Sequence, residues 1–491
     1  MLTRRLLPLL FACAALSGAD PDPAQKLLPE VKKLIDVFNV VIGEAADPVE
    51  PDMAFYQGAI PGMLRTLDPH SSFFDPGQFQ QLQQMERSEQ KGFGSIVSVL
   101  PGRVIVLQAL PGTPSAKAGL SAGDEIVGIN NIALARLEFE QLIQLLSEAR
   151  QHDVTLDVVR PGGMLMRIDM SPDLVNTPSV DRAFHVAPDV GYLRITGFED
   201  PTGKLVRDTI EKLGGANLKG MILDLRNNPG GSVQAALEVA ALFLKPDQVV
   251  FSARGRTAED QVVRVPKLDK GYEFPLVVLV NARTASASEI LSGALQDHDR
   301  ALVFGEPTYG KGLVQQVFTL SGNSGLALTT AFYYTPSGRS IQKPLGEGQL
   351  GAATVVDKGP YKTDSGRIVN GGGGIQPDEV VFPEAQTRLR AVLDASGVLT
   401  SFSGEYIRDH EIPENFDVTA AVLDDFKVYC SAHSIQPSPA EWSSERPWIQ
   451  SRLKQEIATL KFGVAKGDEI EMARDPVVQR GLARLTTAAS R

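Results

Sequence analysis

The sequence predicts a multidomain α/β protein, and three observations support this fold class. Residues 173–385 alternate short apolar segments with helical periods, which is typical of an α/β core. Residues 91–172 contain short strands between Gly and Pro turns, which favours a small β-rich domain. Residues 20–90 and 386–491 have helical periodicity. A chain of 491 residues has room for about three domains, so we expect helical regions on both sides of two folded domains.

The first residues have the features of an export signal. The basic pair Arg4-Arg5 precedes an apolar stretch, Leu6–Leu16, and Ser17–Ala19 offers small residues for cleavage. The apolar stretch is too short to span a bilayer core of about 30 Å. We therefore expect residues 1–19 to be removed and the protein to be exported to the periplasm or cell envelope. Two alternatives stay open: a lipid anchor at Cys13, whose lipobox is loose, and a buried or disordered N-terminus.

The composition limits the kinds of partner. A net charge of −11 and a pI near 5.2 argue against a basic surface for nucleic acid. No segment after the signal is long and apolar enough to predict a membrane span in the mature chain. Signal cleavage would leave one of the two cysteines, Cys430, and therefore no intrachain disulfide. Neither cysteine has a C-x-x-C partner and the six histidines are scattered, so we predict no metal site and no cofactor.

The periodicity of the flanking regions and of the β-rich domain predicts their elements. Residues 78–90 are polar and Gln-rich, and we expect a connector there. In the β-rich domain we expect strands at Val104–Leu107 and Val154–Val159, with an amphipathic helix, Leu137–Leu146, between them. Apolar residues at helical spacing mark the N-terminal region (Val31, Leu34, Ile35, Phe38, Val41, Ile42) and the C-terminal region (Trp448, Ile449, Leu453, Ile457, Leu460).

The α/β segment alternates strand and helix signals. The expected strands are Val190–Ile195, Met221–Leu225, Leu276–Val280 and Ala301–Phe304, and the expected helices are Gln234–Leu244 and Ser286–Gln296. Because buried strands of such a core carry functional groups on their connecting loops, the loops after these strands are the places to look for a site.

The segment 281–290, N-A-R-T-A-S-A-S-E-I, leads from the buried strand Leu276–Val280 directly into a helix. A serine at a helix N-terminus, here Ser286, lies where unpaired N–H groups and the helix dipole favour negative charge. That is where an acyl-transfer oxyanion would develop. The alternative interpretation is purely structural, because Ser286-x-x-Glu289 is also a capping box. This segment alone does not decide between the two.

The segment 305–316, G-E-P-T-Y-G-K-G-L-V-Q-Q, nearly matches a phosphate-binding loop. Gly312 stands where that loop needs a hydroxyl for Mg²⁺, and Leu313–Leu320 has the pattern of a strand, so we do not favour a nucleotide site. Lys311 between two glycines is better interpreted as a positioned group, with an ordinary turn lysine as the alternative. A serine nucleophile needs a base, and a Ser–Lys pair can supply it.

Together the two segments resemble the carboxyl-terminal processing (tail-specific) serine proteases. The family stretches S/T-A-S-A-S-E-I and G-K-G-x-x-Q stand here as Thr284–Ile290 and Gly310–Gln315, and their Ser and Lys are 25 residues apart, as in the family. The resemblance implies that Ser286 is the nucleophile and Lys311 the general base. It implies further that Gln315 helps to hold the lysine and that Asp297 is a supporting acidic residue near the site.

Further family stretches occur in the same order over residues 25–385. They are Leu67–Phe73, Leu223–Gly231, Tyr334–Gln342 and Gly374–Asp378. The resemblance implies a crotonase-like α/β protease core. Asn228-Pro229-Gly230-Gly231 would form a turn in any protein, but in the family this loop supplies one oxyanion N–H. By position we expect Gly230, or otherwise Gly231, with the N–H of Ala287 as the second donor.

Residues 91–172 resemble a PDZ domain. Gly92-Phe93-Gly94-Ser95-Ile96 fits the loop and strand that bind a carboxylate, and Pro111–Leu120 and Ala122–Ile126 fit the helix and turn that follow. Such a domain captures a chain end by its backbone N–H groups and adds the peptide as a strand. The resemblance therefore implies protein substrates with free, apolar C-termini. The alternative is a β-rich domain that only spaces the core.

Two other functions fit parts of the sequence. A hydrolase with a histidine base is conceivable because His298 has acidic neighbours, but a histidine at a helix C-terminus more often only caps it; His70, in a Pro-bounded turn, is expected to be structural. A catalytically silent PDZ scaffold is the alternative of a different class, and it has no need of both Ser286 and Lys311. The sequence leaves open an adaptor protein and a homo-oligomer.

Overall fold

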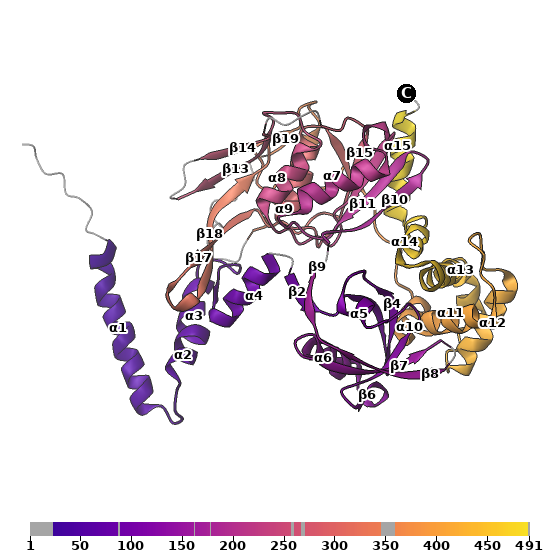
Figure 1. Ribbon diagram of the computed structural model, residues 1–491. Helices are drawn as coiled ribbons and strands as arrows, with labels where there is room; N and C mark the ends of the chain where they lie inside the picture. The colour runs from indigo at the N-terminus through magenta and orange to yellow at the C-terminus, as the bar shows by residue number, and fades with distance from the viewer. Residues whose placement is uncertain are drawn as a thin grey trace, which may run out of the picture. The chain divides into compact units, whose positions relative to one another are not determined.

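The computed structural model describes residues 23–86, 89–161, 163–176, 178–256, 260–266, 271–344 and 359–489. The expected signal peptide and Cys13 lie outside these ranges. The chain divides into two compact units, Met1–Pro69 and His70–Arg491, and each is described by itself (Figure 1).

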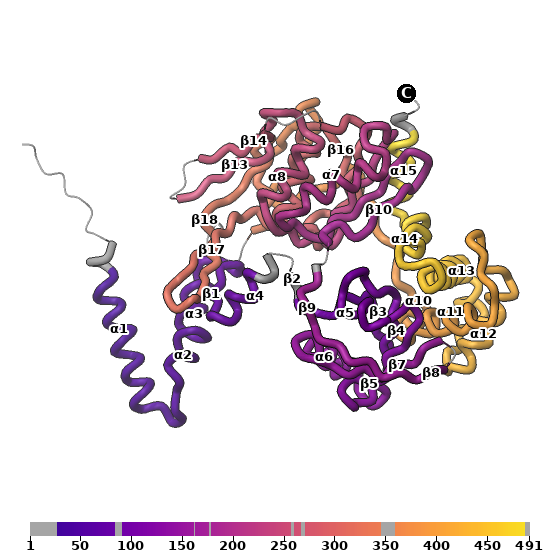
Figure 2. Tube along the Cα trace, in the orientation of Figure 1, coloured from indigo at the N-terminus to yellow at the C-terminus, as the bar shows by residue number. Residues whose placement is uncertain are grey.

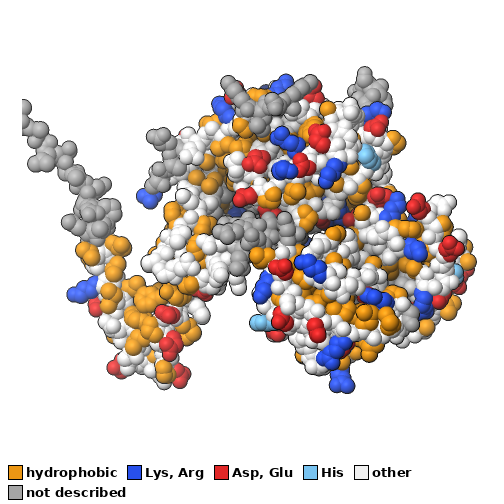
Figure 3. All heavy atoms as spheres, in the orientation of Figure 1, with side chains coloured by type: hydrophobic (Ala, Val, Ile, Leu, Met, Phe, Trp, Pro, Cys, Tyr) orange, Lys and Arg blue, Asp and Glu red, His pale blue; other side chains and the backbone are white. Residues whose placement is uncertain are grey.

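The first unit is helical, as the apolar spacing predicts. Its described part consists of α1 (Pro23–Glu44), α2 (Pro51–Met53), a π-helical segment (Ala54–Ala59) and α3 (Ile60–Arg65). The ring of Phe38 packs against that of Phe55, with centroids 4.7 Å apart. Several apolar side chains of α1 are exposed, and hydrophobic side chains gather over this segment in Figure 3. No helix in the described ranges is long and apolar enough to cross a bilayer.

The second unit begins with a strand that the helical periodicity of residues 20–90 does not predict, followed by a helix where the Gln-rich sequence predicts a connector. Strand β1 (Ser72–Phe74) pairs antiparallel with β18 (Gly325–Tyr334), and α4 (Pro76–Glu86) covers most of the expected connector. The helix forms because Asp75 accepts the N–H of Gln78 (2.9 Å) while the Gln78 side chain accepts the N–H of Asp75. Phe79 is buried, and a Cβ on Gly325 would lie 2.2 Å from its ring, so one apolar contact anchors an otherwise polar helix.

Residues 89–176 form the expected β-rich domain. Its main sheet has the order β3-β4-β5-β7-β8, with β6 beside β5, and β3 lies at the edge. A short two-stranded sheet, β2 with β9, joins the two ends of the domain. The bounds are β2 (Glu89–Gly92), β3 (Ser95–Leu100), β4 (Arg103–Ala109), α5 (Pro114–Lys117), β5 (Glu125–Ile129), β6 (Ile132–Ala133), a 3₁₀ turn (Leu134–Arg136), α6 (Phe139–Ala149), β7 (Val154–Arg160), β8 (Met164–Met170) and β9 (Asp173–Asn176).

The core contains a sheet of order β10-β11-β12-β15-β16-β21, parallel from β11 onward, with β10 antiparallel to β11. Strands β12 and β15 are buried at every residue, as their unbroken apolar sequences predict. The strands are β10 (Val180–Ala187), β11 (Val190–Ile195), β12 (Gly220–Asp224), β15 (Leu276–Val280), β16 (Ala301–Gly305) and β21 (Glu379–Val380). This alternation confirms the predicted α/β class.

Different helices cover the two faces of this sheet. Helices α7 (Thr202–Leu213), α8 (Val233–Ala241) and α9 (Ala287–Asp297) pack on one face. The C-terminal helices α14 (Val464–Met472) and α15 (Pro476–Ala489) pack on the other, where Val478 and Leu485 lie among Ile222 and Val277. Figure 2 shows these last helices in yellow beside the magenta core. The end of the chain is therefore part of the core.

A second sheet and four further helices complete this unit. The sheet has the order β1-β18-β13-β14, and β17 also pairs with β18. Its strands are β13 (Val249–Gly255), β14 (Gln261–Arg264), β17 (Leu313–Thr319) and β18; a small hairpin is formed by β19 (Tyr361–Lys362) and β20 (Ile368–Val369). The helices α10 (Arg388–Ser396), α11 (Val398–Asp409), α12 (Ala420–Ala432) and α13 (Pro439–Phe462) have a core of their own, in which Ile449 and Leu453 are fully buried.

Candidate active site

The loop that carries Ser286 is fastened to the neighbouring strand end. The hydroxyl of Thr284 donates to the carbonyl of Leu225, just after β12, at 2.8 Å, and accepts the N–H of Asn281 at 2.9 Å. The N–H of Ala285 donates to the carbonyl of Asn228 at 3.0 Å. The loop after β15 and the loop after β12 therefore lie side by side, because parallel strands place their carboxyl ends at the same edge of a sheet.

Ser286 has an unusual backbone conformation. Its φ of 55° and ψ of −119° lie in a region that residues with a side chain rarely adopt. The capping serines of α8 and α13, Ser232 and Ser438, are extended, with φ of −60° and −62°. Ser286 does form a capping box with Glu289, but capping requires no such strain. A strained serine between a strand and a helix is the geometry by which α/β hydrolases expose a nucleophile.

The carboxylate of Glu289 joins the serine loop to the lysine loop. Its Oε2 accepts the N–H of Ser286 and the N–H of Lys311, each at 2.9 Å. Its Oε1 accepts the N–H of Gly310 at 2.8 Å and the hydroxyl of Thr308 at 2.5 Å. Ser286 and Lys311 are therefore neighbours in space, since both amide nitrogens lie against one oxygen atom.

Glu289 is fully buried in the core. Burial raises the pKa of its carboxyl, and the hydrogen bonds from the Thr308 hydroxyl and three backbone N–H groups oppose that shift. The sequence predicts only a capping role for Glu289. The S-x-x-E spacing indicates that role, whereas the donors from residues 308–311 approach it only through the tertiary fold.

Lys311 is held by an amide side chain and a crowded turn. Its Nζ donates to Oε1 of Gln315 at 2.6 Å, and Nε2 of Gln315 donates to the carbonyl of His70 at 2.8 Å. Gly310 has a φ of 86°, and a Cβ there would lie 2.7 Å from the side chain of Lys343. Strand β17 follows at Leu313, where a phosphate-binding loop would require a helix. The near match to that motif is therefore coincidental.

The expected oxyanion loop packs directly against the serine. Gly230 has a φ of 102°, and a Cβ there would lie 2.8 Å from the Cβ of Ser286 and 3.0 Å from the nitrogen of Ala287. Only glycine fits at this distance. The N–H of Gly230 donates to Oδ1 of Asn228 at 2.9 Å. Gly230 thus packs against Ser286, and its N–H is directed toward Asn228.

The start of this loop is fixed by residues that the sequence analysis did not single out for a role. Arg226 binds the buried Asp224 at 2.6 Å and Asp475, between α14 and α15, at 2.7 Å. Asn227 and Asn281 exchange two hydrogen bonds of 2.9 Å. The Arg226–Asp475 ion pair joins the loop to the C-terminal helices, and the Asn227–Asn281 pair joins it to the serine loop. The L-D-L-R-x-N stretch indicated the loop but not these partners.

Asp297 and His298 lie away from the reacting groups. Both are at the C-terminal end of α9, an 11-residue helix of about 16 Å whose N-terminus carries Ser286. Asp297 forms a fully buried ion pair with Arg339 at 2.7 Å. His298 contacts Asp364 and the carbonyl of Val249, each at 2.7 Å. The expectation that Asp297 lies near the site is therefore corrected: it stabilises the segment around Arg339.

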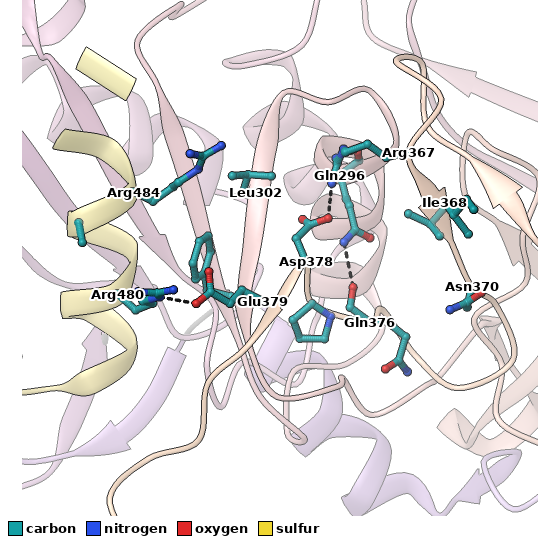
Figure 4. Close-up of a pocket in the computed structure, with 14 residues that line it drawn as sticks. Gln296, Leu302, Arg367, Ile368, Asn370, Gln376, Asp378, Glu379, Arg480 and Arg484 are labelled. Atoms are coloured by element: carbon teal, nitrogen blue, oxygen red, sulfur yellow. Dashed lines mark hydrogen bonds and ion pairs between the residues drawn. The ribbon is translucent and has the colours of Figure 1, made fainter. Parts of the chain in front are cut away.

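A cavity of about 700 Å³ lies at this same distant end of α9 (Figure 4). Two of its arginines form ion pairs with acidic residues of its lining: Arg480 with Glu379, and Arg367 with Asp378. The amide of Gln296 donates to the carbonyl of Gln376 at 2.9 Å. The cavity is separate from the serine and lysine. Among the described residues, no group of three His, Cys, Asp or Glu side chains could hold a metal ion.

The five residues expected to bind a chain end span two strands. Gly92 ends β2, Phe93 and Gly94 form a turn, and Ser95 and Ile96 begin the edge strand β3. The carbonyls of Phe93 and Gly94 accept the N–H groups of Ser115 and Leu110 at 2.9 and 2.8 Å. A Cβ on Gly94, whose φ is 73°, would lie 2.4 Å from Thr113. The turn is therefore fixed from inside the domain.

The sequence is similar to known proteins. A family model for peptidase family S41 matches residues 189–348, and a PDZ domain model matches residues 105–160. A carboxy-terminal-processing protease of Bartonella bacilliformis is 37% identical over 65% of this chain and 74% of its own length. A carboxyl-terminal-processing protease of Synechocystis is 34% identical over 58% and 68%. A solved photosystem II D1 C-terminal processing protease is 26% identical, covering 74% of this chain and 94% of that chain, with a TM-score of 0.41. This chain belongs to peptidase family S41, the carboxyl-terminal processing proteases.

Proposed function

We propose that the protein is an exported serine endopeptidase that recognises protein C-termini through its PDZ domain and cleaves peptide bonds with a Ser286–Lys311 dyad. The observation that best supports the dyad is the buried carboxylate of Glu289, which binds the backbone N–H of both residues. The strained backbone of Ser286 supports the same assignment.

In the proposed mechanism, Oγ of Ser286 attacks the substrate carbonyl while neutral Lys311 accepts its proton. The lysine then protonates the departing amine, and water hydrolyses the acyl-enzyme with the roles reversed. The N–H of Ala287, at the start of α9, and one N–H of Gly230 or Gly231 stabilise the oxyanion. Each such donor is worth roughly 2.7–4 kcal/mol to the transition state.

The alternative functions have less support. His298 lies at the opposite end of α9 and both of its ring nitrogens have partners, which disfavours a histidine base. A silent scaffold would not require the strained Ser286 or a buried carboxylate that joins its loop to Lys311.

The PDZ proposal is supported by the edge position of β3. Its pairing with β4 uses one side of the strand, and the other side has no strand partner in the described sheet. A substrate tail can add there as a further strand. Exposed apolar side chains on β3 and α6 suit an apolar last residue: Ile96 is 37%, Phe139 48% and Ile143 44% exposed.

Export is proposed from the first 19 residues alone. Protein isolated from its native cell envelope is expected to begin near Asp20, or at Cys13 if it carries a lipid. A chain that still begins at Met1 in the cytoplasm would contradict export.

The dyad is tested by replacing two serines of the same motif. Ser286→Ala is expected to lower kcat on an unstructured protein substrate by roughly 10⁴–10⁶-fold, because the nucleophile is lost. Ser288→Ala, one helical position beyond Ala287, is expected to keep substantial activity. Both proteins should remain folded by circular dichroism. An active Ser286→Ala and an inactive Ser288→Ala would show that the nucleophile is misplaced.

A further inference from the structure

The side chain of Gln315 reaches across a strand. Gln315 lies on β17, and β18 lies between β17 and β1, because both strands pair with it. The β17–β18 register shifts at this residue: Val314 pairs with Ala331, but Gln315 pairs with Thr329. Such a bulge changes the direction of a side chain relative to a regular ladder. The extra residue, Thr330, is on β18, and Gln315 contacts the segment on the far side of that strand.

That segment is the dipeptide His70-Ser71, which directly precedes β1. The carbonyl of His70 accepts Nε2 of Gln315 at 2.8 Å. The hydroxyl of Ser71 accepts the N–H of Thr329, the residue paired with Gln315, at 3.1 Å. Ser71 is 7% exposed, so this bond is shielded from water. Two consecutive residues therefore hold both members of the Gln315–Thr329 pair.

The His70 carbonyl also decides which end of the amide faces the lysine. A glutamine side chain has a donor end and an acceptor end. Because the carbonyl of His70 can only accept, it binds Nε2, and Oε1 is left to accept Nζ of Lys311 at 2.6 Å. If this carbonyl moved away, the amide could rotate and present its NH₂ group to the ammonium group, where two donors would face each other.

We propose that Ser71 is a positioning residue of the protease: through Thr329 and the His70 carbonyl it fixes the amide of Gln315, and thereby Lys311. This proposal rests on the proposed role of Lys311 as the general base. It gives a role to the L-D-P-H-S-x-F stretch, which lies outside the residues 189–348 matched by the S41 family model. The base is thus held by a chain segment that precedes the PDZ domain.

The test is a double-mutant cycle between Ser71 and Gln315, with kcat and KM measured separately. Gln315→Ala and Ser71→Ala are each expected to lower kcat by about 10–100-fold with little change in KM, because the base is misplaced while substrate binding is intact. The double variant should be no slower than Gln315→Ala, since both changes break one pathway. Ser324→Ala is the matched control: it removes another buried hydroxyl next to β18, bonded to the Ser321 carbonyl at 2.9 Å, and should leave kcat unchanged.

The outcomes separate this proposal from the proposed function. Full activity of Gln315→Ala would contradict the use of Gln315 to hold the base. A different outcome is that Gln315→Ala lowers kcat and that the fold-losses of kcat in the two single variants multiply in the double variant. That outcome would overturn the role of Ser71 and leave the dyad intact.

A second pair of variants distinguishes loss of the Ser71 hydrogen bond from misfolding. Ser71→Thr keeps the accepting oxygen, whereas Ser71→Val has the same shape without it. We expect Ser71→Thr to retain kcat and Ser71→Val to lose it, at equal Tm. Equal kcat in these two variants would overturn the proposal.

Discussion

At the scale of single residues, Ser286 and Glu289 combine a capping role with a place in the candidate site. The capping box that stabilises the start of α9 uses the same two side chains that organise the candidate site. The capping box includes one hydrogen bond to the Glu289 carboxylate. The bonds from Thr308, Gly310 and Lys311 instead join the lysine loop to the start of α9. The structural and functional interpretations of this sequence therefore do not exclude each other.

The proposed role of Lys311 as the base makes activity depend on pH. A free lysine has a pKa near 10.4, so only its deprotonated fraction can accept a proton from Ser286. We expect kcat/KM to rise from neutral to mildly alkaline pH. Lys311→Arg should lose roughly 10²–10⁴-fold in kcat, because arginine does not deprotonate in proteins. His298→Ala, whose side chain lies at the far end of α9, should keep most activity. A fully active Lys311→Ala would refute the dyad.

At the scale of elements, helices α14 and α15 are the main revision of the expected organisation. The helical periodicity predicts one C-terminal helical region, residues 386–491. In the structure these helices form two groups that pack in different cores. Helices α10–α13 form their own core, and α14–α15 complete the core of the α/β sheet. An amphipathic pattern identifies the buried face of a helix, but the same pattern fits a sheet or a neighbouring helix equally well.

A pair of valine substitutions tests this contribution of α15. Val478→Asp is expected to lower the free energy of unfolding of the core by about 3–5 kcal/mol, because an unpaired charge would enter a fully buried site beside the sheet. Val428→Asp, on α12 and 71% exposed, should change it by less than about 0.5 kcal/mol. Denaturant unfolding, followed by activity and circular dichroism, measures both. Equal effects of the two substitutions would show that α15 is dispensable for the core.

At the scale of the whole molecule, the β-rich domain contacts the C-terminal helices at residues that lie far apart in sequence. The guanidinium of Arg103, at the start of β4, donates to the hydroxyl of Ser401 on α11 and pairs with Glu125 at 3.0 Å. A Cβ on Gly397, whose φ is 69°, would lie 2.3 Å from the side chain of Leu100. The β3–β4 turn therefore holds the PDZ domain against the C-terminal helices. Ser95 lies at the opposite end of β3 from this turn.

The proposed capture of substrate tails predicts a strong effect of the terminal carboxylate. Amidation of the substrate C-terminus is expected to lower kcat/KM by about 10–100-fold, because a charged hydrogen-bonding group is worth about 1.5–3 kcal/mol. Two aspartates appended to the tail should act similarly by replacing the apolar last residue. Substitutions at the cleavage point should have smaller effects, since the binding energy is gathered elsewhere. Equal cleavage of free-acid and amidated substrates would show that the PDZ domain does not recognise tails.

By itself, the sequence determined the α/β class, the protease family and the segments that carry Ser286, Lys311 and Gln315. These are local properties: an apolar strand, a motif of small residues and a turn between two glycines are each contained within about ten residues. Helix α4 forms where the Gln-rich sequence predicts a connector, because Phe79 is buried among its mostly polar residues. Only the tertiary structure decided that Glu289 serves both loops, that Asp297 lies away from the site, that Gly230 directs its N–H to Asn228 and that His70 holds Gln315. The roles of Glu289 and His70 depend on contacts between segments distant in the chain, and sequence spacing does not specify which donor meets which acceptor in such contacts.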